Sequence, residues 1–87
     1  MEAYLFYSRQ TAGERQMAQF ADRLTARGVT VELIDADSER GTRLVEIYDL
    51  MARPVVAVVR DDGGLIQAWT DPEQLPSVED VSYWAHL

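Results

Sequence analysis

The chain has no cysteine, no lysine and a single histidine among its 87 residues. The absence of cysteine excludes disulfides, thiolate catalysis and thiolate metal ligation, so packing alone must hold the domain together. His86 lies next to the C-terminal residue. We expect a frayed end there, and therefore no metal site or Ser-His-Asp arrangement built on this histidine.

Acidic residues outnumber basic residues by 15 to 8, which gives a formal net charge of −7. All the basic residues are arginines, and most are interleaved with acids. Nucleic-acid binding draws on clustered cations that neutralise phosphates, so this charge pattern predicts no nucleic-acid partner. No apolar run approaches the length of a membrane span, and the N-terminus has no basic segment followed by an apolar one. We expect a cytoplasmic protein with no membrane partner.

Hydrophobic residues make up 47% of the chain and charged residues 26%, which are ordinary values for a globular protein. A chain of this length forms one domain with a modest core. We therefore expect a single folded domain over residues 1–87.

The first half of the chain predicts two strand-helix units. Residues 3–7 form an apolar and aromatic run typical of a strand buried on both faces. Met17, Phe20, Ala21 and Leu24 then recur at helical spacing, and Gly28 offers a C-terminal stop. Residues 29–35 predict a second strand nearer a sheet edge, and residues 39–50 predict a second helix whose first turn is weakened by a glycine.

The second half predicts a hairpin and a last helix. Residues 55–59 are β-branched almost throughout, and residues 61–64 carry the Asp-Asp-Gly-Gly sequence of a tight turn before a returning strand over 65–70. Ser77 and Asp80 can cap a helix that carries Val78, Val81 and Ala85. The resulting order is βαβαββα. Right-handed crossovers predict that the first three strands are parallel, with the fourth antiparallel to the third. We expect an α/β fold with a four-stranded mixed sheet and helices on both faces.

This order, together with Thr11-Ala12-Gly13-Glu14 after the first strand and Arg53-Pro54 before the third, resembles a thioredoxin or glutaredoxin domain. The family carries Cys-x-x-Cys where Thr11 and Glu14 stand, and a cis-proline where Pro54 stands. The resemblance implies a thioredoxin-like fold of glutaredoxin size. Thiol-disulfide exchange requires a thiolate, so the domain is expected to be redox-inactive.

Thr11 and Glu14 have the spacing of a capping box. In that motif the Thr11 hydroxyl accepts from the backbone N–H of Glu14, and the Glu14 carboxylate returns to the N–H of Thr11. We expect this local cap to start the first helix without a thiol.

Because the domain is expected to be redox-inactive, we predict that it acts as a protein-interaction module. The backbone beside Pro54 is expected to pair with an extended segment of another protein, because the family uses that edge for substrates. The nearby helix start favours an acidic or carbonyl group. We assign no catalytic residue, no metal ligand and no cofactor. The candidate binding surface comprises Ser8, Thr11, Ala12, Gly13, Glu14, Arg53, Pro54 and Trp69.

Three other interpretations stay open or are set aside. Thr11 could hold a small molecule of the glutathione type, or serve a non-thiol enzyme, although Thr70-Asp71-Pro72 replaces the family's glutathione-holding motif. The second strand could pair with a second copy of the chain. A calcium loop over Asp35, Asp37, Glu39 and Glu46 is disfavoured because Arg40 stands where the turn requires glycine.

Overall fold

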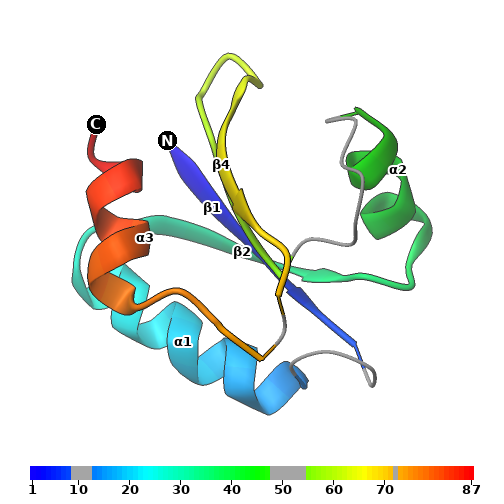
Figure 1. Cartoon of the computed structure of the whole chain (residues 1–87), viewed down its shortest axis with the longest axis horizontal. Helices are drawn as coiled ribbons and strands as arrows, with labels where there is room; N and C mark the ends of the chain where they lie inside the picture. Colours follow the sequence, from blue (N-terminus) through cyan, green and yellow to red (C-terminus); the bar gives the residue numbers. More distant parts are fainter. Residues whose placement is uncertain (9–12, 48–54, 72) are drawn as a thin grey trace.

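Four strands form one mixed sheet in the order β2-β1-β3-β4 in the computed structural model (Figure 1). The structure describes residues 1–8, 13–47, 55–71 and 73–87. The predicted order βαβαββα is confirmed. Its elements are β1 (Glu2–Tyr7), α1 (Glu14–Ala26), β2 (Thr30–Asp35), α2 (Glu39–Ile47), β3 (Val56–Val59), β4 (Leu65–Trp69) and α3 (Val78–Ala85).

The direction of β3 differs from the prediction. β1 and β2 are parallel, as expected, but β3 runs antiparallel to β1, with Leu5 opposite Val56 and Glu2 opposite Val59. The crossover rule fixes the hand of a connection that returns to a parallel strand, and it does not require the return to be parallel. The prediction of a parallel third strand was therefore wrong, whereas the antiparallel β3-β4 hairpin is confirmed.

Helices cover both faces of the sheet, as predicted. Figure 1 shows α1 and α3 together on one side and α2 on the other. Successive side chains of a strand point to opposite faces, so Leu5 and Phe6 of β1 enter different cores. The core under α1 and α3 contains Ala3, Leu5, Met17, Leu24, Val56, Val58 and Val81, and the core under α2 contains Tyr4, Phe6, Ile34, Ala36, Ala57 and Val59.

The predicted turns and caps are mostly found where the sequence places them. Gly28 follows α1 with a φ of 80°, and Gly63 adopts a φ of 93° in the hairpin turn, so both use a region that favours glycine. The Ser77 hydroxyl accepts a hydrogen bond from the backbone N–H of Asp80 at 3.0 Å and caps α3. The predicted second helix is described as far as Ile47, and its remaining residues lie outside the described part.

β2 and β4 form the two edges of the sheet, which confirms the expected edge position of the second strand. On β4 the Trp69 carbonyl accepts from Val55 on the inner side, so the neighbouring Ala68 N–H points away from the sheet. The Gln67 side-chain oxygen accepts from that N–H at 3.0 Å. Across the described residues, no helix has the length and apolar character needed to cross a membrane.

Candidate functional site

A cleft of about 340 Å³ opens where β1 and β2 end beside the start of α1. The last residues of the two strands, Tyr7 and Asp35, are direct neighbours in the parallel ladder. Ligands in open α/β sheets commonly bind at the carboxyl ends of the strands, so this location is a natural candidate. The cleft is lined by Tyr7, Ser8, Gly13, Glu14, Asp35 and Asp37.

The structure brings together three of the predicted surface residues, Ser8, Gly13 and Glu14, on this cleft. Ser8 is buried, whereas Gly13 and Glu14 are exposed. Four other predicted residues, Thr11, Ala12, Arg53 and Pro54, lie outside the described residues. The structure therefore places Ser8, Gly13 and Glu14 of the predicted surface on one cleft.

Val55 places the start of the third strand near this cleft. Its carbonyl accepts from the N–H of Phe6 at 2.8 Å, and its own N–H donates to the Trp69 carbonyl at 2.7 Å. Val55 therefore bridges the ends of β1 and β4 immediately after Pro54. Arg53 and Pro54 themselves lie outside the described residues.

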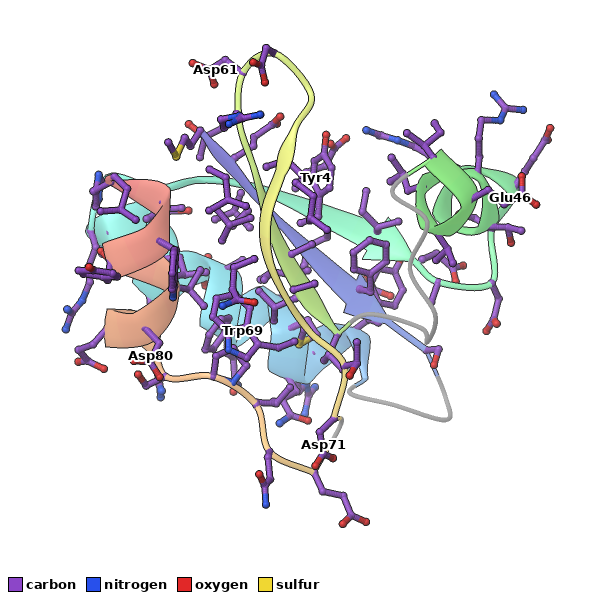
Figure 2. All side chains as sticks on the ribbon, turned by 45° about the horizontal axis from the view of Figure 1, so that its top comes forward. Tyr4, Glu46, Asp61, Trp69, Asp71 and Asp80 are labelled. Atoms are coloured by element: carbon purple, nitrogen blue, oxygen red, sulfur yellow. The ribbon has the colours of Figure 1, made fainter. Side chains whose placement is uncertain are left out.

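Trp69 does not line the cleft. Its half-buried side chain packs against the core under α1 and α3, and Figure 2 shows it on the opposite side of the sheet from Tyr4. Trp84 packs against the same core, whereas Tyr83 is 63% exposed. Trp69 is connected to the start of β3 through its backbone, because its carbonyl accepts the hydrogen bond from Val55.

The start of α1 differs from the predicted capping box. The N-cap is Gly13, with extended φ and ψ of −72° and 165°, and no side chain caps it. The first bond of the helix joins the Met17 N–H to the Gly13 carbonyl at 3.1 Å. Glu14 is thus the first helical residue and not the fourth position of a box, so the capping-box prediction was wrong. A Thr-x-x-Glu pattern shows only that a capping box is possible at that point in the sequence. Here the N-cap is Gly13, two residues after Thr11.

The charged residues that line the described part of the cleft are all acidic. Glu14 contributes its charge from the first turn of α1, where a carboxylate is favoured by the helix dipole, and Asp35 and Asp37 contribute theirs from the loop after β2. Partial burial, followed by the negative charges of Glu14 and Asp35, raises the pKa of the Tyr7 phenol above its usual value of 10.0. Tyr7 therefore remains a neutral hydrogen-bonding group among carboxylates at physiological pH.

The loop after β2 forms a braced wall of the cleft. The Asp35 carboxylate accepts from the Asp37 N–H at 2.9 Å, and the Ser38 hydroxyl donates to the Asp35 carbonyl at 2.6 Å. The same hydroxyl accepts from the Gly41 N–H at 3.0 Å, which caps α2. A side chain at Gly41 would overlap the Asp35 carbonyl oxygen, so this glycine permits α2 to sit against the loop.

Sequence reasoning missed Tyr7, Asp35 and Asp37 as members of this site. The parallel β1-β2 pair was predicted, and the carboxyl ends of two parallel strands share one sheet edge, so that pairing was the signal that could have placed them together. Asp35 and Asp37 were instead considered for a calcium loop. Among residues 1–8, 13–47, 55–71 and 73–87, no group of three acidic, histidine or cysteine side chains is arranged to hold a metal ion.

His86 is also placed differently from the prediction. Its Nε2 lies 2.9 Å from the carbonyl oxygen of Arg27, so the ring reaches from the end of α3 to the end of α1. The Arg27 guanidinium in turn pairs with Glu79 at the start of α3, at 2.9 Å. The expectation of a frayed end was wrong at this residue, which has a structural contact.

Comparison of the chain with protein-family models, with curated proteins and with solved structures finds no match.

Proposed function

We propose that this chain is a redox-inactive, thioredoxin-like interaction module, and that its cleft binds an extended segment of another protein. The observation that carries the proposal is the convergence of Ser8, Gly13 and Glu14 on one cleft at the ends of two parallel strands. The element order and the helices on both faces support the thioredoxin-like assignment. The lack of cysteine supports a binding role over a thiol reaction.

The charge of the cleft defines the segment that fits it. Glu14, Asp35 and Asp37 place negative charge on both sides of the opening, and this opposes the acidic group that the helix start alone would favour. A lysine or arginine side chain is complementary to these carboxylates and can also lie against the Tyr7 ring. We therefore propose a partner segment with a basic side chain.

The same charges weigh against the glutathione-type alternative. Glutathione carries two carboxylates, and the described part of the cleft offers no arginine to receive them. Backbone pairing beside Arg53 and Pro54 remains part of the proposed contact, since Val55 lies next to Phe6 at the same edge.

A pull-down with a charge-reversal pair tests the proposal. Glu14→Arg reverses a charge at the cleft, and Glu46→Arg makes the same change on α2, away from it (Figure 2). We expect the wild type and Glu46→Arg to capture the same proteins and Glu14→Arg to lose a subset. Arg53→Glu examines the neighbouring edge in the same experiment.

Identical protein sets for all variants would contradict the proposed cleft. A titration with glutathione, followed by backbone amide shifts, addresses the alternative. Saturable shifts at Ser8, Gly13 and Glu14 would favour the small ligand over the peptide.

A further inference from the structure

A second concave surface lies on another side of the molecule, between α1 and the segment that leads into α3. Figure 1 shows that segment, in orange, running alongside α1. Two cavities, of about 330 and 500 Å³, lie between them, and both are lined by Phe20 and Arg23. We call their union the α1–α3 groove. Arg27, Leu75, Val78 and Glu79 also line it.

The floor of the groove is apolar and held by the core. Phe20, Leu75 and Val78 are half-buried, and each packs against the cluster under α1 and α3. Their remaining surface faces the groove, because all three line it. An apolar side chain that lay on this floor would remove further hydrophobic surface from water.

The groove also carries positive charge in a chain whose net charge is −7. Arg27 is paired with Glu79, as described above, and Arg40, Arg43 and Arg60 also have carboxylate partners. Arg23 is exposed and makes no ion pair or hydrogen bond within the described part of the chain. Counting Arg23, Arg27 and Glu79, the groove carries one excess positive charge.

We propose that the α1–α3 groove binds an extended segment of a partner protein in which an apolar side chain stands close to a carboxylate. The apolar side chain lies on Phe20, Leu75 and Val78, and the carboxylate pairs with Arg23. A guanidinium can bind a carboxylate through two parallel hydrogen bonds, which gives the contact direction as well as attraction.

The charge pattern argues against other occupants. A basic segment would meet Arg23 without compensation, and a polyanion such as nucleic acid would be repelled by the chain as a whole. A second copy of the chain would bring another net charge of −7 to the contact. The α1–α3 groove shares no lining residue with the acidic cleft, whose carboxylates favour a basic segment instead.

The test uses short synthetic peptides and the whole chain labelled with ¹⁵N. Each peptide places one phenylalanine and one aspartate, separated by zero, one or two residues, in a Gly-Ser background. Matched peptides carry asparagine or lysine in place of the aspartate. Arg23→Glu removes the proposed contact, and Arg15→Glu makes the same change of charge on α1 outside the groove.

We expect at least one aspartate peptide to cause saturable amide shifts at Phe20, Arg23 and Val78. Arg23→Glu and the asparagine peptide should each weaken its binding about tenfold or more, the loss of one charge-assisted contact. The affinity of Arg15→Glu for this peptide should stay within about twofold of the wild-type value, because the changed charge lies outside the groove and is screened by salt.

Three results would overturn the proposal. The first is the absence of saturable shifts at peptide concentrations up to about 1 mM, the weakest affinity that would count as a specific contact. The second is equal weakening by Arg23→Glu and Arg15→Glu. The third is binding at another surface, seen either as amide shifts confined to the acidic cleft or as self-association of the chain. Self-association would appear as a mass that depends on protein concentration in the absence of peptide.

Discussion

Nε2 of His86 donates a hydrogen bond to the backbone carbonyl of Arg27 across 2.9 Å, joining the C-terminal ends of α3 and α1. A carbonyl oxygen can only accept, so the proton of this bond must be on Nε2. The Arg27 carbonyl belongs to the last turn of α1, where helix carbonyls lack partners within the helix. This single contact satisfies one of them from 59 residues away.

Replacing His86 should measure the value of that contact. We expect His86→Ala to lower the free energy of unfolding by about 0.5–1.5 kcal/mol, the usual net contribution of one hydrogen bond. His86→Gln keeps a side-chain donor and should lose less. Urea denaturation of the three proteins provides the comparison, and equal midpoints for all of them would show that the bond adds nothing.

Gly41 permits the close approach of α2 to the loop after β2. Gly41→Ala should destabilise the protein by about 1–3 kcal/mol, because its Cβ would overlap the Asp35 carbonyl oxygen and force the backbone to move. Thr42→Ala, at the next and exposed position, should change stability by less than about 0.7 kcal/mol. Thermal unfolding checks both. A Gly41→Ala protein as stable as the wild type would mean that the loop adapts freely.

Ser77 caps α3 through its bond to the Asp80 N–H. Ser77→Ala should cost about 1 kcal/mol of folding free energy, whereas Ser77→Asp retains an accepting oxygen and should remain near the wild type. Amide hydrogen exchange in the first turn of α3 gives a local readout beside the global one. Unchanged protection at Asp80 in Ser77→Ala would contradict the assigned role.

Tyr7 reports on the electrostatics of the acidic cleft. Glu14→Gln should bring the Tyr7 pKa down towards 10.0, because it removes a negative charge that opposes ionisation. Glu46→Gln should leave this pKa where it is. The measurement is a pH titration of the labelled Tyr7 ring followed by NMR, and a Tyr7 pKa that is the same in both variants would refute the assigned cause.

The sign of the linkage to stability follows from the raised pKa. The folded protein holds the phenol proton more tightly than the unfolded chain does, so this contribution is fully present below the unfolded pKa of 10.0. It is lost as the pH rises through the folded pKa. Glu14→Gln should therefore reduce the fall in stability at alkaline pH.

Local patterns in the sequence predicted most of the secondary structure. Alternation, helical spacing and turn residues act over a few positions, which is why the hairpin at Gly63, the stop at Gly28 and the Ser77 cap were found. Strand direction is not local. The antiparallel arrangement of β3 against β1 depends on how the chain returns after α2, and no short pattern encodes that path.

The candidate site shows the same limit. Ser8, Gly13 and Glu14 were named from their position after the first strand, and the structure places them on one cleft. Asp35 reaches that cleft through the pairing of β1 with β2. The His86 contact and the α1–α3 groove likewise depend on the packing of α3 and its leading segment against α1.

The bond from the Ala68 N–H to its neighbour Gln67 determines how the free edge of β4 can be used. Exposed strand edges are where proteins recruit stray strands and begin to aggregate. A strand that approached β4 would have to displace the Gln67 side chain before it could accept from Ala68. At Ala68 this bond therefore opposes the addition of a further strand to the sheet.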